Sequence, residues 1–161
     1  GALELVAEFS RRPGLVVGAG TVLTVEDAKA AVRAGARFLV SPVMDEEVVR
    51  AAVDLGAVAM PGCHTPTELL RAHRAGAALQ KLFPAPAGGP DYVRSVLLPM
   101  PFLRIVPTNG ITAENAAAYL AAGAVAVGFV ASLFSAEDLA AGRFERVEER
   151  ARALLAAVRA P

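Results

Sequence analysis

Residues 78–85 read Ala78-Leu79-Gln80-Lys81-Leu82-Phe83-Pro84-Ala85, a short apolar run that holds one lysine and ends at a proline. Such a run is typical of a buried strand. Burial disfavours the ammonium form and lowers the pKa of a lysine, and a neutral amine can attack a carbonyl carbon to form a Schiff base. A lysine can also extend its ammonium group from a strand end to solvent. Position alone leaves both interpretations open.

Apolar runs of this kind recur along the chain and alternate with helical patterns, as in a series of βα units. The six runs are 15–22, 38–41, 57–60, 78–83, 104–106 and 124–128. Several are continuous rather than alternating, which predicts parallel strands buried on both faces. The predicted helices are 2–11, 25–34, 46–54, 115–122 and a charged C-terminal helix at 145–159, whose charged face we expect to be solvated.

The helical patterns carry start and stop signals. The segment Thr65-Pro66-Thr67-Glu68 offers an N-cap threonine, a proline at the first helical position and a glutamate three residues after the cap. A threonine also precedes the helices that begin near Glu26 and Glu114. These signals assign Glu68 and Glu114 to helix starts rather than to catalysis. A glycine follows four helical patterns, at the position of a C-cap: Gly35, Gly56, Gly76 and Gly123.

The bulk composition indicates one compact domain over residues 1–161. The 161 residues are 55% hydrophobic, which suffices for a sizeable core. The formal net charge is zero and no basic block occurs, so the sequence predicts no nucleic-acid or membrane partner. The single cysteine, Cys63, forms no internal disulfide and indicates no metal cluster. Without a signal-peptide pattern, the expected location is the cytoplasm.

Unusual residues gather where the predicted strands end, including Gly20-Thr21, Ser41-Pro42, Pro61-Gly62 and Thr108-Asn109-Gly110. The carboxyl ends of parallel strands carry the chemistry of βα barrels, so this clustering predicts an enzyme. Six strands fall short of the eight of a closed (β/α)8 barrel. Two architectures therefore stay open: a doubly wound sheet, although its Gly-x-Gly-x-x-Gly fingerprint is incomplete here, and a barrel without its first two strands.

Five motifs, taken together and in this order, resemble the 2-keto-3-deoxy-6-phosphogluconate aldolase family and its 4-hydroxy-2-oxoglutarate aldolase relatives. They are Gly18-Ala19-Gly20-Thr21-Val22-Leu23, Val40-Ser41-Pro42, Pro61-Gly62-Cys63-His64-Thr65-Pro66-Thr67-Glu68, Lys81-Leu82-Phe83-Pro84-Ala85 and Pro107-Thr108-Asn109-Gly110-Ile111. The resemblance implies an α/β fold of the (β/α)8 TIM-barrel type, with six of its eight strands evident and an N-terminal truncation relative to the family. It also implies a homotrimer.

The family resemblance implies a class I aldolase that needs no cofactor and no metal. Lys81 falls on the Schiff-base lysine, which would attack the keto carbon of pyruvate or of a 2-keto-3-deoxy acid substrate. The protonated imine would then accept the electrons of the carbon–carbon bond that breaks. Thr21 matches a threonine near the pyruvate carboxylate, and Pro42 and Phe83 match residues that pack around the imine. Thr108 matches a residue that lines the same pocket.

Two departures from the family pattern affect the expected chemistry. The family's general base, a glutamate on its second strand, and a nearby carboxylate-binding arginine have no counterpart here. General acid–base help is worth about 10²–10⁴-fold in rate, so we expect imine formation with weak turnover. Family members that act on phosphorylated substrates carry Gly-Gly-Ser after the last strand, where Phe129-Val130-Ala131 stands here. Bulky side chains obstruct a backbone phosphate site.

The altered phosphate motif leaves the substrate class open. Asn109 replaces a family glycine but tolerates a left-handed backbone, so this change is mild. Gly110, Ser132 and the pair Gly88-Gly89 are the candidate phosphate ligands. A substrate without phosphate is the other possibility.

Two further interpretations of the whole chain stay open beside the aldolase. One is a phosphate-binding barrel isomerase or epimerase, in which Lys81 acts electrostatically. The other is a barrel remnant that binds a keto acid without forming an imine or that only assembles with partners. The adjacent Cys63 and His64 could suggest a thiolate site, but neighbouring residues of an extended strand point to opposite faces.

Overall fold

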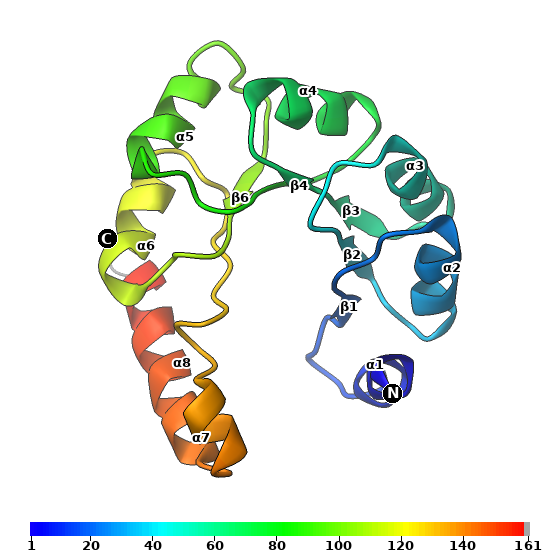
Figure 1. The fold of residues 1–161 in the computed structure, drawn as a ribbon, viewed down its shortest axis with the longest axis vertical. Helices are drawn as coiled ribbons and strands as arrows, with labels where there is room; N and C mark the ends of the chain where they lie inside the picture. Colours follow the sequence, from blue (N-terminus) through cyan, green and yellow to red (C-terminus); the bar gives the residue numbers. More distant parts are fainter. Residues whose placement is uncertain (160–161) are drawn as a thin grey trace. The chain divides into compact units, whose positions relative to one another are not determined.

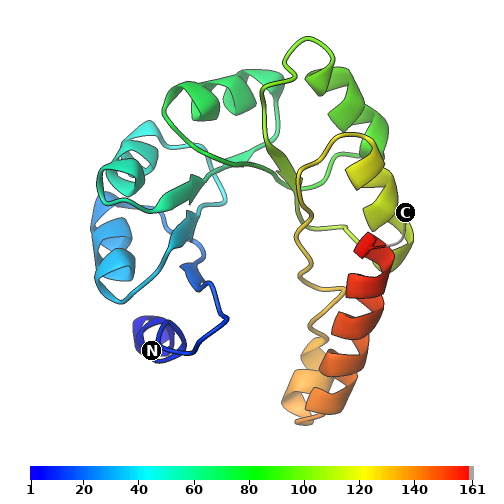
Figure 2. The same ribbon diagram turned by 180° about the vertical axis from the view of Figure 1, so that it is seen from behind.

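The computed structural model describes residues 1–159 as alternating helices and short strands (Figure 1, with the reverse view in Figure 2). The chain divides into two compact units, the first Gly1–Lys81 and the second from Leu82 onward. Residues 160–161 of the predicted domain lie outside the described residues. One domain over the whole chain stays a prediction.

The first unit holds a parallel sheet with helices against it. Its helices are α1 (Ala2–Phe9), α2 (Val25–Arg33), α3 (Glu46–Asp54) and α4 (Pro66–Arg74). Its strands are β1 (Gly18–Ala19), β2 (Phe38–Val40), β3 (Val58–Met60), β4 (Gly62–Cys63) and β5 (Gln80–Leu82), whose last residue begins the second unit. Strands β1, β2 and β3 pair in parallel in that order, and α2 and α3 lie along the same side of them (Figure 1).

The second unit is mostly helical. Its elements are α5 (Gly89–Leu97), β6 (Ile105–Pro107), α6 (Ala113–Ala121), α7 (Ala136–Ala140) and α8 (Phe144–Arg159). The backbone N–H of Thr108, directly after β6, donates to the carbonyl of Leu82 at 3.0 Å. Helix α8 packs against α6 and α7. No helix within residues 1–159 is both long enough and apolar enough to cross a membrane.

The α/β class and the parallel strands are confirmed, and six strands occur within residues 1–159, but they are not the six predicted. The predicted strand 57–60 is followed by a second short strand, β4, because Pro61 has no N–H and interrupts the run. The predicted strand 15–22 shrinks to β1, since Leu15 and Val16 are exposed. The run 57–60 thus agrees with β3 to within one residue, whereas the run 15–22 is correct in place and too long.

The predicted strand 124–128 is wrong as a strand. It contributes a single parallel bridge between Gly128 and Thr108, beside hydrogen bonds from Val125 N–H to the Ile105 carbonyl and from Gly128 N–H to the Pro107 carbonyl. These isolated bonds fall short of a continuous ladder, so the segment follows β6 without forming a regular strand.

The predicted helix signals are confirmed. The Thr65 hydroxyl accepts from the N–H of Glu68 at 3.3 Å, and the Glu68 carboxylate accepts from the N–H of Thr65 at 2.8 Å, which is a complete capping box. These bonds occupy the Glu68 carboxylate and lower its pKa, with the largest contribution from the N–H of His64. The four predicted C-cap glycines all have a left-handed backbone: Gly35, Gly56, Gly76 and Gly123.

A buried carboxylate joins α7 to α8. The Asp138 carboxylate lies 2.7 Å from Arg150 Nη1, 2.7 Å from Arg143 Nε and 3.6 Å from Arg146 Nη1, and its residue is 4% exposed. The hydrogen bond from Arg150, together with the charges of Arg143 and Arg150, outweighs desolvation and lowers the pKa of Asp138. The charged face predicted to be solvated on the last helix is thus partly internal.

We expect Asp138→Asn to lower the melting temperature at pH 7, because it leaves three arginines around an uncharged amide. The low folded pKa means that the carboxylate stabilises the fold above its unfolded pKa and loses this effect as the pH falls below about 4. The difference in melting temperature between wild type and variant should therefore shrink from pH 7 to pH 3. Glu137→Gln, which changes an exposed carboxylate beside the same Arg143, is the matched control. An equal difference at both pH values would contradict the linkage.

Candidate functional site

The predicted site residues of the first unit lie at one end of its strands. Thr21 follows β1 closely and Pro42 follows β2, at the carboxyl ends of two paired parallel strands. Lys81 lies inside β5, where its backbone N–H donates to the carbonyl of Pro61 at 3.0 Å. Pro61 directly follows β3, so the Lys81 backbone is level with the carboxyl end of that strand. This is the end at which βα barrels place their chemistry.

The surroundings of the Lys81 side chain favour the neutral amine that imine formation requires. The residue is half-buried, and desolvation lowers the pKa of its ammonium group. A lowered pKa increases the fraction of neutral amine, which is the nucleophilic form. The apolar run alone left a desolvated lysine and a solvent-extended lysine open, and the lowered pKa favours the first.

The backbone of Thr21 is strained. Its φ is +58°, in the left-handed region that β-branched residues rarely occupy. Such a conformation costs about 1–3 kcal/mol, and strained residues gather at functional sites. Thr21 also lines a cavity of about 280 Å³ between α1, β1 and α2, together with Gly20 and Asp27. Lys81 is not among the residues that line this cavity.

In the second unit, hydrogen bonds connect the loop after β5 to the loop after β6. The N–H of Ala85, two residues beyond Phe83, donates to the carbonyls of Thr108 at 3.0 Å and Asn109 at 3.2 Å. Phe83 is half-buried, whereas Asn109 and Gly110 are exposed. Four of the residues that the family resemblance selects therefore belong to one pair of connected loops: Phe83, Thr108, Asn109 and Gly110.

The loop after β6 has the backbone that its sequence predicts. Asn109 has a φ of +63° and Gly110 a φ of +90°. The prediction that Asn109 tolerates a left-handed backbone is confirmed.

Thr108 is the buried polar residue of these loops. It is 6% exposed, and its hydroxyl has no hydrogen-bond partner in residues 1–159. Gly128 makes room for it, because a side-chain methyl group at Gly128 would overlap the Thr108 methyl group. A buried hydroxyl without a partner costs about 1–3 kcal/mol, and a bound water or ligand is the usual explanation.

Ser132 lies elsewhere in the second unit. It lines a cavity of about 210 Å³ with Arg150 and with the first turn of α6, and Thr108, Asn109 and Gly110 are not among the lining residues. Arg150 was not predicted as a functional residue. No local pattern identifies it, because its partner Asp138 is twelve residues away and its neighbours on α8 form an ordinary charged helix.

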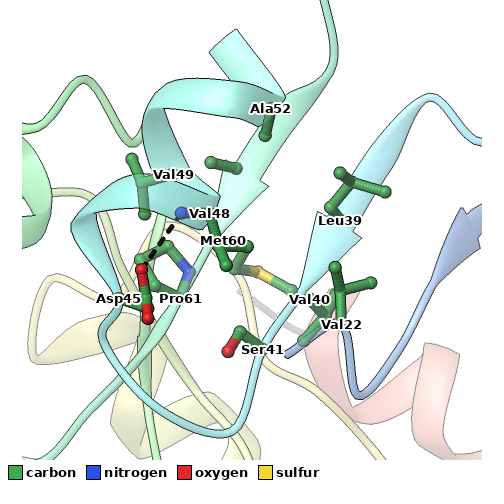
Figure 3. A pocket seen from close by; sticks show the side chains of 11 residues that line it. Val22, Leu39, Val40, Ser41, Asp45, Val48, Val49, Ala52, Met60 and Pro61 are labelled. Atoms are coloured by element: carbon green, nitrogen blue, oxygen red, sulfur yellow. Dashed lines mark hydrogen bonds between the residues drawn. The ribbon is translucent and has the colours of Figure 1, made fainter. Parts of the chain in front are cut away.

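A smaller cavity in the first unit is part of the core. It lies between α3 and the strands β2 and β3, near Ser41 and Asp45 (Figure 3). Its volume of about 10 Å³ is close to the minimum for one water molecule, so it cannot hold a keto acid. Both polar side chains are occupied, since the Ser41 hydroxyl donates to the Val43 carbonyl and the Asp45 carboxylate caps α3.

The Cys63 and His64 pair does not form a thiolate site. Cys63 is 2% exposed and His64 is exposed, so the two side chains point to opposite faces as predicted. Burial, with a smaller contribution from the charge of Glu68, raises the pKa of the Cys63 thiol to about 12. The thiol therefore stays protonated and unreactive near pH 7.

Comparison with known proteins identifies the family. The family model described as KDPG and KHG aldolase matches residues 1–150. The 2-dehydro-3-deoxy-6-phosphogalactonate aldolase of Escherichia coli K12 is 36% identical over 145 residues, which cover 89% of this chain and 69% of that protein. The chain thus spans about two thirds of the length of this curated relative.

Solved structures that are similar to this chain point to the same family. A native KDPGal structure has a TM-score of 0.87 and 34% identity, over 98% of this chain and 74% of the other. The KDPG aldolase of Legionella pneumophila, solved with pyruvate captured as a covalent carbinolamine intermediate, has a TM-score of 0.84 and 30% identity, over 95% and 74% of the two chains.

These matches confirm three predictions at the level of the family: the resemblance itself, the (β/α)8 barrel type and carbon–carbon lyase chemistry of the class I aldolases. The chain therefore belongs to the KDPG and KHG aldolase family.

Proposed function

We propose that this chain forms a Schiff base between Lys81 and a 2-keto-3-deoxy acid. In this proposal the chain acts as an aldolase that cleaves the acid to pyruvate and an aldehyde. The observation that carries the proposal is the desolvated, half-buried amine of Lys81 at the strand end where the family motifs gather. The covalent pyruvate intermediate of the Legionella pneumophila relative supports the same chemistry.

The reaction begins when the Lys81 Nζ lone pair adds to C2 of the keto acid and gives a carbinolamine. Loss of water from this carbinolamine produces a protonated imine. The C3–C4 bond then breaks and its electron pair moves toward the imine nitrogen, which gives an enamine. The C4 hydroxyl loses its proton and becomes the carbonyl of the aldehyde. Addition of a proton at C3 and of water at C2 releases pyruvate and the free amine.

The remaining site residues have positioning roles in this proposal. We assign the pyruvate carboxylate to the neighbourhood of Thr21, and packing around the imine to Pro42 and Phe83. The family resemblance also assigns Thr108 to this pocket, and its hydroxyl is buried without a hydrogen-bond partner in residues 1–159. The homotrimeric state remains a prediction from the family resemblance, and the cytoplasmic location remains a prediction from the sequence.

Trapping with borohydride tests the proposal directly. Incubation with pyruvate and borohydride, followed by intact-mass measurement and peptide mapping, should show one reduced pyruvyl adduct on the peptide that contains Lys81. This readout requires the amine but not the base for carbon–carbon cleavage. It therefore tests the Schiff base more directly than a measurement of turnover does. An adduct confined to Lys29 or to the N-terminal amine would contradict the proposal.

The rate of trapping should depend on pH in a way that reports the Lys81 amine. Only the neutral amine attacks, so the rate rises with pH through the pKa of Lys81 and then levels off. Because desolvation lowers this pKa, the midpoint should lie below about 10.4, the value of an unperturbed lysine. The measurement is the initial adduct rate across the pH range, with the borohydride reduction kept fast. A midpoint at or above that of a free lysine would show that the amine is not desolvated in solution.

A further inference from the structure

We propose that His64 is a catalytic residue whose imidazole moves a proton to and from C3 of the keto acid bound to Lys81. This inference rests on the proposed Schiff base. The reaction needs such a group, because the enamine must gain a proton at C3 before pyruvate is released. The family motifs within residues 1–161 assign no residue to this step.

The register of the neighbouring strands β4 and β5 places His64 and Lys81 on the same face. The Lys81 N–H donates to the Pro61 carbonyl at 3.0 Å. A bond of the same kind joins β3 to β2, and there the donor lies opposite the residue that follows the acceptor. Lys81 therefore lies opposite Gly62, and His64 follows Gly62 by two residues. Alternate residues of an extended chain share a face, so His64 belongs to the face of Lys81.

The burial of the adjacent side chains agrees with this register. Gln80 and Leu82, on either side of Lys81, are fully buried, and so is Cys63, the residue before His64. By contrast, Lys81 is half-buried and His64 is exposed. The lysine and the histidine therefore share the less buried face at the carboxyl end of these strands.

The lysine side chain is long enough to bring the reaction to the level of His64. Gly62 has no side chain, so the first side chain on this face of the chain that leaves β4 is that of His64. Two residues of a parallel strand span about 7 Å. The four-carbon stem of Lys81 is flexible and can bring Nζ toward this level. An imidazole nitrogen there can reach C3 of a keto acid joined to Nζ.

Hydrogen bonds hold the backbone of His64 in place. The Glu68 carboxylate accepts from the His64 N–H at 2.9 Å, and it also accepts from the N–H and the hydroxyl of Thr65, both at 2.8 Å. The imidazole is thus attached to a fixed point, and proton transfer depends on such positioning. The bond from His64 uses its backbone, so it persists when the side chain is replaced.

The proposed step moves one proton and the electron pairs of two bonds. A neutral imidazole nitrogen of His64 takes a proton from C3 of the protonated pyruvyl imine. The C3–H electron pair forms the C2–C3 double bond, and the π pair of the C=N bond moves to the Lys81 nitrogen. The products are the enamine and an imidazolium. In the cleavage direction the imidazolium returns its proton to C3 of the enamine, which restores the imine. A histidine suits both directions, because it changes protonation near neutral pH.

Other charged groups at this end of the elements near β4 do not explain a titration near neutral pH. They are Lys81 of β5, Glu68 of α4, and Asp45, Glu46 and Glu47 at the start of α3. The hydrogen bond from the His64 N–H lowers the pKa of Glu68, and that from Arg71 lowers the pKa of Glu46. The Asp45 carboxylate accepts two N–H groups of α3. At saturating pyruvate Lys81 is held in the imine, so its amine no longer titrates.

Exchange of the pyruvate methyl protons for deuterium, followed by proton NMR in D2O at saturating pyruvate, tests this role. We expect exchange by the wild type, at a rate that rises between about pH 5 and 8 as neutral imidazole forms. His64→Asn should lower the rate about 100-fold and remove the rise, since the general base is lost. The borohydride-trapped adduct and the melting temperature should not change, because His64 is exposed and its bond to Glu68 uses the backbone.

His73→Asn is the matched control, because His73 is the other histidine of the chain and lies exposed in the last turn of α4. Its exchange rate should equal that of the wild type. Added imidazole should restore exchange in His64→Ala, which a purely structural role would not allow.

The outcomes separate this role from the Schiff base. Exchange at the wild-type rate in His64→Asn, with the adduct intact, would overturn the role of His64 alone. Loss of the adduct in His64→Asn would also overturn it, since the residue would then act on imine formation and not at C3. The same holds for a wild type that forms the adduct but exchanges no methyl protons. Absence of the adduct in the wild type would instead contradict the Schiff base of Lys81.

Discussion

Replacement of Lys81 by arginine will abolish the borohydride-trapped pyruvyl adduct. A guanidinium group keeps the positive charge and the length of the side chain, but it stays protonated at all accessible pH values and cannot act as the nucleophile. In an assay of substrate cleavage, the loss in turnover should be at least about 10³-fold, since the covalent step is removed. Intact mass and peptide mapping measure the adduct, and the cleavage rate measures turnover.

The second lysine provides the control for this experiment. Lys29 lies exposed on α2, and Lys29→Arg should leave the adduct unchanged. Lys81→Met removes the charge of the side chain but keeps an unbranched side chain that can pack in its place. It removes an ammonium group that is costly to desolvate, so its melting temperature should equal or exceed that of the wild type while the adduct disappears. An adduct of wild-type yield in either Lys81 variant would exclude this lysine as the Schiff-base residue.

Gly62→Ala will destabilise the first unit by about 3 kcal/mol. A methyl group at Gly62 would lie inside contact distance of the carbonyl carbon and oxygen of Pro42, and 3.0 Å from the carbonyl oxygen of Ser41. These are backbone atoms, which cannot move aside as a flexible side chain can. Either β4 or the segment after β2 must shift, and Pro42 is one of the proposed imine-pocket residues. Urea unfolding measures the loss of stability, and the trapping assay measures the expected loss of adduct.

Gly20→Ala is the matched control for this substitution. Gly20 has no heavy atom near the position of an added methyl group, and it is not in the left-handed region. Its unfolding midpoint should change by no more than about 0.5 kcal/mol in free energy. If Gly62→Ala unfolds at the same urea concentration as Gly20→Ala, the close approach of β4 to Pro42 does not exist in solution.

The features that sequence analysis predicted well depend on neighbours in the chain. Helix α3 begins and ends where the pattern placed it, and Thr65, Glu68 and the C-cap glycines act within a few residues of one another. The lowered pKa of Lys81 agrees with the burial that its apolar run suggests. The family could be stated from five short motifs because each occupies a single strand end.

The errors arose where pairing between distant segments decides the outcome. A run of apolar residues at 124–128 has the composition of a strand, but only its contacts with β6 determine whether a ladder forms, and a single bridge is found. The strand after Pro61, β4, is likewise defined by the chain segment that lies beside it and not by its own sequence. Strand length is set by the partner strand and not by propensity alone.

The sequence by itself determined the α/β class, the boundaries of α3, the Schiff-base lysine candidate and the family, because these rest on local periodicity, capping and short motifs. Only the tertiary structure decided that Gly62 meets Pro42, that the Thr108 hydroxyl is buried without a hydrogen-bond partner in residues 1–159, and that Arg150 joins Asp138 and lines a cavity. The physical reason is the same in each case. Burial and hydrogen bonding depend on which atoms surround a side chain, and for these residues the decisive atoms belong to segments that are distant in sequence.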